Sequence, residues 1–180
     1  MCAGRCAPHS APNGGVDTAR LYADGSRVAY AHTADGKGTR TIWARGAWKQ
    51  NAYDARGLVS GTTYSDAATP SVAYAYADSG ALAAATLSDG TSYGYSYDDR
   101  LLCTNESVTV GGEAFAVCRT YDGFRRASET AVVVADVRHA AKVRLYDSED
   151  RVCGYALTNA AGRGVSVALA YDGSHVTNTT

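Results

Sequence analysis

An aromatic residue followed by Asp, at once or within three residues, recurs along this chain at intervals of 21 to 25 residues. The seven aromatic positions are His32, Tyr53, Tyr76, Tyr97, Tyr121, Tyr146 and Tyr171. Self-similarity at a fixed spacing of roughly 20 to 50 residues marks a repeat architecture, in which each unit is too small to bury its own apolar face and stacks on its neighbours. The period therefore disfavours a compact enzyme.

The composition fits a folded chain of one domain that is rich in strands. Of its 180 residues, 46% are hydrophobic and 19% are charged, which is ordinary for a folded soluble protein. The 13 Tyr favour strands, because Tyr combines a large apolar body with a polar tip and suits a sheet face that is half exposed.

Charge and hydropathy argue against several functions. The 17 basic and 18 acidic residues are mixed along the chain, so no nucleic acid partner is expected. No stretch approaches the ~18 apolar residues of a membrane span, so no membrane insertion is expected either. Residues 1–10 lack the apolar core of a secretory signal. Two explanations stay open: a cytoplasmic protein, or an internal piece of a longer polypeptide that carries the address elsewhere.

The cysteines do not predict a disulfide framework, because they are odd in number and the chain is large enough to fold without one. Cys2, Cys6 and His9 have a loose metal-like spacing but no second pair, so no metal is expected there. Cys103 and Cys118 flank Gly111-Gly112, and a hairpin at that point would bring them near each other. We expect free, partly buried thiols, because disulfide geometry is narrow.

The chain divides into an irregular tail or degenerate repeat edge at residues 1–20 and a β-repeat region at residues 21–180. Alternation of large residues over 71–76, 92–97 and 107–110 predicts strands. Tight-turn dipeptides such as Asp89-Gly90 separate these strands at about half the repeat length. Each repeat of about 23 residues therefore predicts one β-hairpin, and no segment carries a helical stripe with caps.

The repeats resemble the YD-repeat, or Rhs-repeat, family, over about residues 22 to 175. The clearest copies are Tyr53-Asp54-Ala55-Arg56-Gly57-Leu58-Val59 and Tyr76-Ala77-Asp78-Ser79-Gly80-Ala81-Leu82. Later copies lose the turn glycine: the copy at Tyr97 lacks it, and Arg125 and Asp150 stand in its place after Tyr121 and Tyr146. This erosion leaves open that the chain is a decayed remnant as well as a fragment or a full protein.

The Asp, the Gly and the aromatic residue of the motif each have a structural role that follows from their chemistry. The Asp can accept hydrogen bonds from backbone N–H groups in the following turn, and the Gly adopts a left-handed conformation at low cost. Asp150 tolerates that conformation, whereas Arg125 adopts it only with strain, which predicts a reshaped turn. The aromatic rings are expected to stack from one repeat to the next. The structural motif residues are Tyr53, Asp54, Gly57, Tyr76, Asp78, Gly80, Tyr97, Asp98, Tyr121, Asp122, Tyr146, Asp147, Tyr171 and Asp172.

The resemblance implies a fold and a function. It implies an all-β, antiparallel sheet of hairpin repeats that curves, open or spiralling, as an arc of a shell. Such shells enclose or display a C-terminal toxin or effector in bacteria and form part of an adhesion protein in teneurins. The implied partners are the remaining repeats of a longer polypeptide and an enclosed effector domain, and the implied location is secreted or at the cell surface. The Asp-Pro-x-Gly-Leu signature associated with self-cleavage is absent, since no Pro follows an Asp.

Other functions have weaker support in the sequence. The chain contains none of the motifs of hydrolases, phosphate loops or metalloproteases, so we expect no catalytic residues, no cofactor and no metal, and a hydrolase is the least favoured alternative. The acidic residues Asp147, Glu149 and Asp150 fall on a turn, where solvated carboxylates are usual. Glycosylation sequons begin at Asn105 and Asn178. The main alternative is a cell-surface binding module whose strands expose Tyr74, Tyr76, Tyr93, Tyr95 and Tyr97 to carbohydrate or protein.

Overall fold

The computed structural model describes residues 18–179, which form strands and turns and no helix. Its contacts divide the chain into two parts. The first part comprises residues 18–75 and 86–89, and the second part comprises residues 76–85 and 90–179. Each part is described separately below. None of the described residues belongs to a helix long and apolar enough to cross a membrane.

The first part is a run of short antiparallel strands that pair in chain order. The strands are β1 (Ala19–Leu21), β2 (Arg27–His32), β3 (Gly38–Ile42), β4 (Trp48–Tyr53), β5 (Val59–Tyr64) and β6 (Val72–Tyr76), whose last residue already counts to the second part. The next strand, β7 (Leu82–Leu87), gives its last two residues to this part. Each consecutive pair from β1 to β6 is antiparallel.

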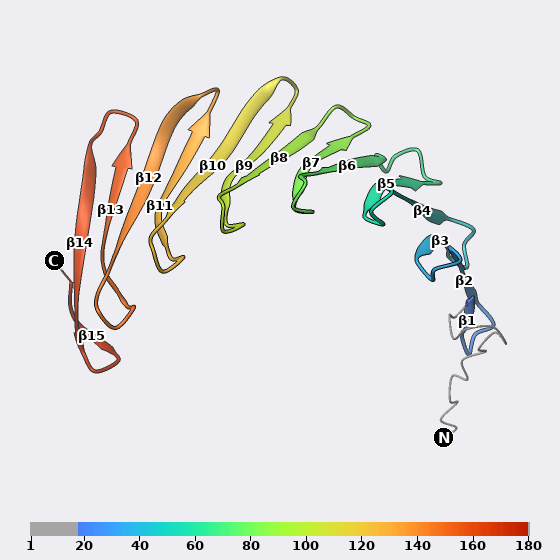
Figure 1. Cartoon of the computed structure of the whole chain (residues 1–180), viewed down its shortest axis with the longest axis horizontal. Coiled ribbons are helices and arrows are strands. Elements are labelled where there is room, and N and C mark those ends of the chain that lie inside the picture. The colour runs from blue at the N-terminus through green and yellow to red at the C-terminus, as the bar shows by residue number, and fades with distance from the viewer. Residues whose placement is uncertain (1–17, 180) are drawn as a thin grey trace. The chain divides into compact units, whose positions relative to one another are not determined.

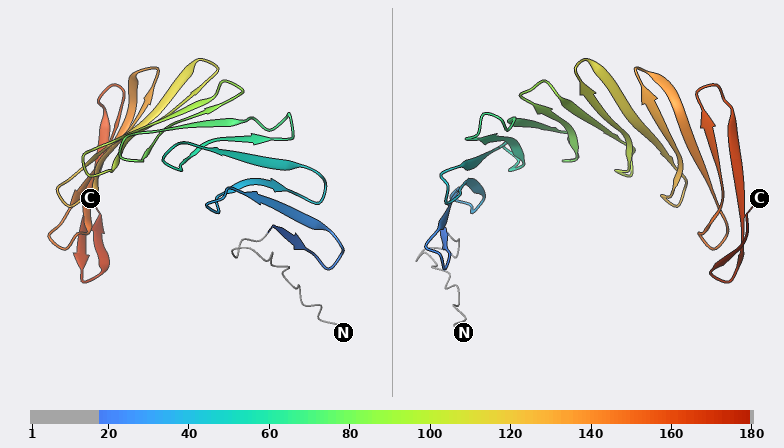
Figure 2. Two further views of the ribbon diagram at one scale, coloured as in Figure 1. Left: turned by 45° about the vertical axis from the view of Figure 1, so that its right-hand side comes forward. Right: turned by 180° about the vertical axis from the view of Figure 1, so that it is seen from behind.

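The second part continues the same pattern with longer strands. They are β8 (Ser92–Tyr97), β9 (Cys103–Val110), β10 (Glu113–Tyr121), β11 (Ala127–Val134), β12 (Val137–Tyr146), β13 (Val152–Asn159), β14 (Gly164–Asp172) and β15 (His175–Thr179). From β8 onward every strand pairs with the next one antiparallel. The hairpins β9–β10, β11–β12 and β13–β14 lie side by side in every view (Figures 1 and 2). The predicted class, an all-β sheet of antiparallel hairpin repeats that does not close, is confirmed.

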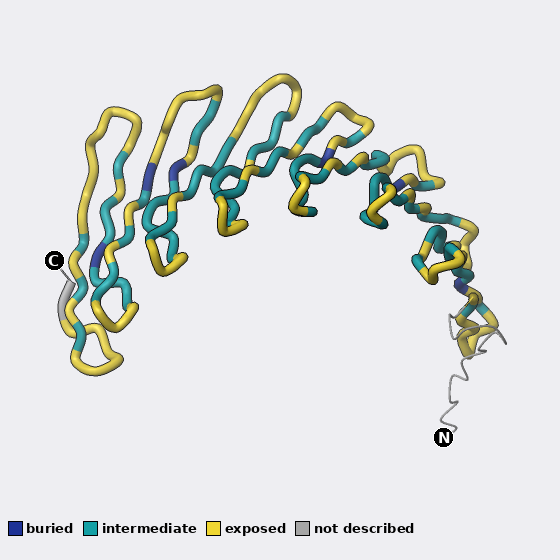
Figure 3. The backbone as a smooth tube through the Cα atoms, in the orientation of Figure 1, coloured by how far each residue is buried: buried dark blue, intermediate teal, exposed yellow. Residues whose placement is uncertain are grey.

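Neither part has a thick hydrophobic core. Among the described residues, the buried apolar side chains are Val28, Ala85, Ala131 and Ala141, and no large side chain is fully buried. Figure 3 shows that buried positions lie within strands, whereas the hairpin tips are exposed. Strands contact their neighbours in the sheet, so cross-strand pairs and turn contacts stabilise the described chain more than burial does.

The two faces of the sheet carry different side chains, as period-2 alternation requires. In β8, Tyr93 and Tyr95 point to one face, and Gly94 and Ser96 point to the other. The register places Tyr95 opposite Glu106 and Gly94 opposite Ser107 in β9. A Cβ added to Gly94 would lie only 2.8 Å from Oγ of Ser107, so this small-residue face has little room for side chains.

Two-residue turns close the hairpins β9–β10 and β11–β12. Gly111 and Gly112, with φ of 58° and 88°, join β9 to β10, and the predicted hairpin at this position is confirmed. Ala135 and Asp136 join β11 to β12 with φ of 47° and 62°. Two positive φ values define a type I′ turn, which favours Asn-Gly and disfavours Ala at the first position.

We therefore expect the double substitution Ala135→Asn and Asp136→Gly to raise the free energy of unfolding by about 1 to 2 kcal/mol. Urea denaturation should show a higher midpoint with an unchanged slope. Gly112→Ala is the reciprocal control, because an added Cβ there meets no atom within 4 Å and its cost would come from the backbone alone. An unchanged midpoint in the double variant would contradict this account of the turn.

Candidate functional site

The turn that follows six of the seven register aromatics recurs with the same backbone hydrogen bonds. In the turn at Asp54, the Gly57 N–H donates to the Asp54 carbonyl at 2.9 Å, and the Asp54 N–H donates to the Leu58 carbonyl at 2.8 Å. Oδ1 of Asp54 accepts from the N–H groups of Arg56 at 2.9 Å and Leu58 at 2.8 Å. This is a type I turn followed by a left-handed residue and a bulge, the usual three-residue hairpin loop. The expectation that the Asp satisfies backbone donors in the turn is confirmed.

The same carboxylate contacts recur in three later turns. Asp98, Asp122 and Asp147 each accept two backbone N–H groups through Oδ1, at 2.9 to 3.0 Å. Asn159 does the same for Ala161 and Arg163, at a turn that the aromatic period did not identify. The sequence interpretation considered only Asp after an aromatic residue, whereas Asn at the first turn position can also accept hydrogen bonds from the backbone.

Two motif residues lie elsewhere than the pattern predicts. Ala77 occupies the first turn position after Tyr76, so Asp78 lies one residue later, and the Gly80 N–H still donates to the Ala77 carbonyl at 2.9 Å. Asp172 pairs with His175 at the end of the β14–β15 hairpin, so it does not cap a turn of the same kind.

The left-handed position of the turn is kept when glycine is lost. Gly57 and Gly80 have φ of 79° and 83°, while Leu101, Arg125 and Asp150 have φ of 60°, 68° and 65°. The prediction that Arg125 reshapes its turn is wrong, since the Arg125 N–H still donates to the Asp122 carbonyl at 3.1 Å. The two N–H bonds to the Asp122 carboxylate and the register of the flanking strands outweigh the steric cost of the left-handed residue.

The register tyrosines tie each repeat to the preceding one through their hydroxyl groups. In five register tyrosines, the hydroxyl donates to the carbonyl of the residue six positions after the preceding register aromatic, at 2.7 to 3.0 Å. The pairs are Tyr53 with Gly38, Tyr97 with Leu82, Tyr121 with Cys103, Tyr146 with Ala127, and Tyr171 with Val152. Desolvation raises the pKa of Tyr97, which keeps that hydroxyl protonated as a donor. The link between repeats is thus a hydrogen bond, whereas the sequence predicted ring stacking. Among the described residues, a contact between aromatic rings joins Tyr30 to His32 within one strand.

A basic side chain fills the space between a turn carboxylate and the next register tyrosine. Nε of Arg126 donates to Oδ2 of Asp122 at 2.7 Å, and its guanidinium lies 4.3 Å from the ring centroid of Tyr146. Arg151 repeats this arrangement with Asp147 at 2.8 Å and with the Tyr171 ring at 4.5 Å. Cation–π contacts of this kind add to the hydroxyl link. The sequence signal for this contact, which was missed, is a basic residue four positions after the Asp.

The turn carboxylates are held in the ionised form. Hydrogen bonds from backbone N–H groups, that of Leu58 and that of Leu102 above all, lower the pKa of Asp54 and of Asp98. For Asp122 and Asp147 the largest single influence is partial desolvation, which acts to raise the pKa. Backbone hydrogen bonds and the Arg126 and Arg151 guanidinium groups together outweigh it, so both pKa values also lie below the ordinary value.

These lowered pKa values predict acid sensitivity. Above about pH 5 the carboxylates are ionised in both states, and their full contribution to stability is present. As the pH falls, the unfolded chain binds protons first, so stability is lost down through the folded pKa values. Urea midpoints from pH 7 to pH 2.5 should fall less steeply for Asp54→Asn and Asp98→Asn, which keep the acceptor oxygen but do not titrate. Asn159→Asp should steepen the fall; identical slopes in all variants would contradict this assignment.

The candidate metal residues do not form a ligand set in the described chain. Glu149 and Asp147 pair with Arg151, and Asp150 pairs with Arg126. No group of three potential ligands occurs among residues 18–179. Cys103, Cys118 and Cys153 are free and half-buried, as expected for the first two. Cys2, Cys6 and His9 lie outside the described residues, as does the end of the sequon that begins at Asn178.

The predicted binding tyrosines do not share one open surface. Tyr74, Tyr76, Tyr95 and Tyr97 are half-buried, and the Tyr97 hydroxyl is bonded to the Leu82 carbonyl. Tyr93 is 37% exposed and borders a shallow apolar groove with Phe115 and Val132, each 43% exposed. The groove has a volume of about 280 Å³. Burial of the register rings favours the structural interpretation, and only Tyr93 keeps the geometry of a binding residue.

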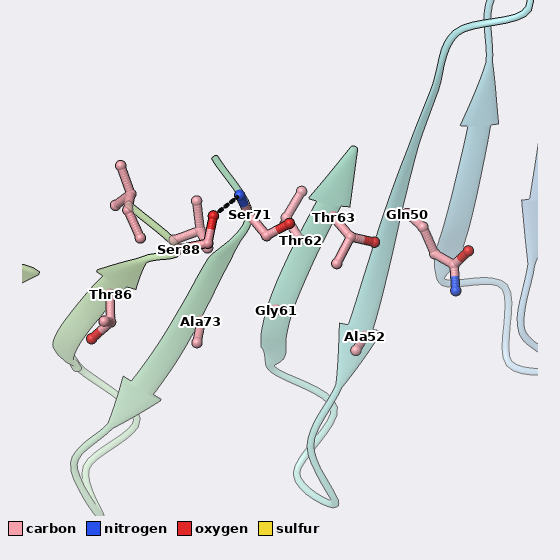
Figure 4. A pocket seen from close by; sticks show the side chains of 11 residues that line it. Gln50, Ala52, Gly61, Thr62, Thr63, Ser71, Ala73, Thr86 and Ser88 are labelled. Atoms are coloured by element: carbon pink, nitrogen blue, oxygen red, sulfur yellow. Dashed lines mark hydrogen bonds between the residues drawn. The ribbon is translucent and has the colours of Figure 1, made fainter. Parts of the chain in front are cut away.

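The first part contains a larger hollow of about 500 Å³. Figure 4 shows short side chains around it, including Ala52, Ala73 and Thr63, with a hydrogen bond from the Ser71 N–H to Oγ of Ser88. No charged or imidazole side chain lines this hollow. The lining therefore offers no general base or nucleophile pair for hydrolysis.

No family model matches the sequence, and no curated protein matches it. The crystal structure titled TcdB2-TccC3-Cdc42 matches with a TM-score of 0.66 and 12% identity over 86% of this chain and 9% of that one. The structure titled TcdB2-TccC3-TEV matches with a TM-score of 0.54 and 9% identity over 80% of this chain and 10% of that one. This chain thus spans about a tenth of the length of the structures it matches, and at this identity the likeness concerns the fold. In its fold, the chain resembles a stretch of the TcdB2-TccC3 structures, as expected from the resemblance of its aromatic-Asp pattern to Rhs/YD repeats.

Proposed function

We propose that this chain is a non-catalytic wall segment of an Rhs/YD-repeat β-shell that encloses or displays a toxin or effector domain. The observation that carries the proposal is the hydroxyl link from five register tyrosines to the preceding repeat, because it joins neighbouring hairpins without needing a core. The likeness to TcdB2-TccC3 structures supports it. The partners would be further repeats of a longer polypeptide and the enclosed domain, and the location would be secreted or at the bacterial cell surface.

Protease protection tests this proposal on the natural polypeptide that contains the chain. If the repeats form a container, a segment of that polypeptide should stay uncut by a nonspecific protease until urea unfolds the repeats. Mass spectrometry would identify the protected segment. Uniform cutting of all non-repeat segments in native buffer would overturn the enclosure.

A second function is favoured by one observation, the apolar groove beside Tyr93 and Phe115. An exposed aromatic residue in an apolar groove is a common feature of carbohydrate and protein binding surfaces. A glycan array tests this alternative. Tyr93→Ser should abolish any binding at the groove while Tyr74→Ala leaves it intact, and binding that survives Tyr93→Ser would remove the groove from consideration.

A further inference from the structure

The turn glycine is missing from three successive repeats of the second part, and two of the replacements reach a neighbouring turn. Nη2 of Arg125 donates to the carbonyl of Arg100, one repeat earlier, at 3.2 Å. The Asp150 carboxylate accepts from Nη1 of Arg126, again one repeat earlier. Leu101, the third replacement, is 56% exposed and carries no polar group.

Other arginines complete a row of contacts along the same edge. Nη1 of Arg100 donates to the Asp122 carbonyl in the next turn at 3.0 Å, while its other nitrogens bind Asp98. Arg151 donates in the same way to the Gly173 carbonyl in the turn that follows it. On this edge, each of the turns at Asp98, Asp122 and Asp147 is therefore joined to the following turn of the same edge by at least one arginine.

We infer that Arg125 and Asp150 are not decayed glycines but links that join consecutive turns along one edge of the sheet, here called the arginine edge. A left-handed conformation disfavours a residue with a Cβ, so keeping a long or charged side chain there has a cost. The contacts that Arg125 and Asp150 make with the preceding turn offset part of that cost, and a glycine cannot make them. This role is independent of any enclosed cargo, so it stands or falls separately from the proposed function.

The link between Arg126 and Asp150 joins two charged side chains, so it should respond to ionic strength. These side chains are 22% and 74% exposed, so salt screens their attraction. This link should hold its two turns together at low salt and loosen at high salt, whereas the links of Arg100, Arg125 and Arg151 end on backbone carbonyls and should respond less. The turns of the first part that have glycine at the left-handed position serve as an internal reference. Glycine has no side chain that could contact a neighbouring turn from that position.

Hydrogen exchange of turn amides, measured by mass spectrometry on the full chain at 20 mM and 1 M NaCl, tests the inference. Asp150→Asn is the informative change, because Asn also tolerates the left-handed conformation but carries no charge. At 20 mM NaCl it should speed exchange in the turn at Arg126 about two- to fivefold, and at 1 M NaCl the difference should vanish. Arg125→Asn should likewise speed exchange in the turn at Arg100.

Leu101→Gly is the matched control, because it relieves the same backbone strain and removes no link. It should slow exchange in its own turn at both salt concentrations, whereas Arg125→Gly should give a smaller slowing or none. The inference is overturned if Asp150→Asn exchanges like the parent at low salt. It is equally overturned if Arg125→Gly slows exchange as much as Leu101→Gly does.

Discussion

Tyr146→Ala is expected to lower the free energy of unfolding by about 2 to 3 kcal/mol. The ring is half-buried beneath the Arg126 guanidinium, and its hydroxyl donates to the Ala127 carbonyl at 3.0 Å. Truncation removes the apolar area, the cation–π contact and the hydrogen bond at once, in a sheet without a core to compensate. Urea denaturation gives the total effect, and hydrogen exchange should place the largest loss of protection in the turn at Arg126 and at Ala127.

Tyr146→Phe separates these contributions. It keeps the ring and removes the hydroxyl, so the expected loss is about 0.5 to 1.5 kcal/mol. Tyr155→Phe is the matched control, since this tyrosine lies on an adjacent strand, under Lys142, but is not at a register position. If Tyr146→Phe is as stable as the parent, the hydroxyl link does not join the repeats. If Tyr155→Phe is destabilised equally, register position is irrelevant.

A reciprocal exchange at the left-handed position is the second large effect. Gly80→Leu should destabilise the chain by about 1 to 2 kcal/mol, and Leu101→Gly should stabilise it by about 1 kcal/mol, because a Cβ is disfavoured at positive φ. Gly80 has φ of 83°, and an added Cβ there would meet no atom within 4 Å, so the cost is conformational.

The two variants should shift the urea midpoint in opposite directions without changing the slope. Leu101 is mostly exposed, so its removal sacrifices little packing. A destabilising Leu101→Gly would show that this side chain has a packing role, and a neutral Gly80→Leu would show that the turn adapts. The first result would contradict the view that Asp98 and the strand register alone impose the turn geometry at Leu101, and the second would contradict the conformational cost assigned to a Cβ at positive φ.

The architecture was predictable because it is local. A period of about 23 residues, alternating strands and Asp-Gly turns each depend on a few neighbouring residues, and the Asp54 and Asp98 turns formed as their sequence indicates. The contacts between repeats were not predictable in the same way. Whether the Tyr121 hydroxyl reaches a neighbouring ring or the Cys103 carbonyl depends on strand stagger at the bulge beside Tyr121, which no residue type reveals.

Glycine loss misled the sequence interpretation for a related reason. A missing glycine was taken to predict a changed turn at Arg125, although the hydrogen bonds of Asp122 suffice to hold the old one. The contacts of Arg125 and Asp150 with the preceding turns depend on which turns the sheet brings side by side, and the residue types alone do not specify this. The loss of the turn glycine therefore indicated the conformational cost of the substitution, but it did not indicate the side-chain contacts that offset this cost.

The six-residue count from one register aromatic to the carbonyl that receives the next tyrosine has an evolutionary consequence. The count is constant between His32 and Gly38 and between Tyr146 and Val152, although the interval between aromatics varies from 21 to 25 residues. All variation in length therefore falls between that carbonyl and the next aromatic, in the strand ends and tips of the opposite edge. Insertions there would lengthen a hairpin without disturbing its bond to the neighbour, so one edge can diversify while the other preserves the spacing.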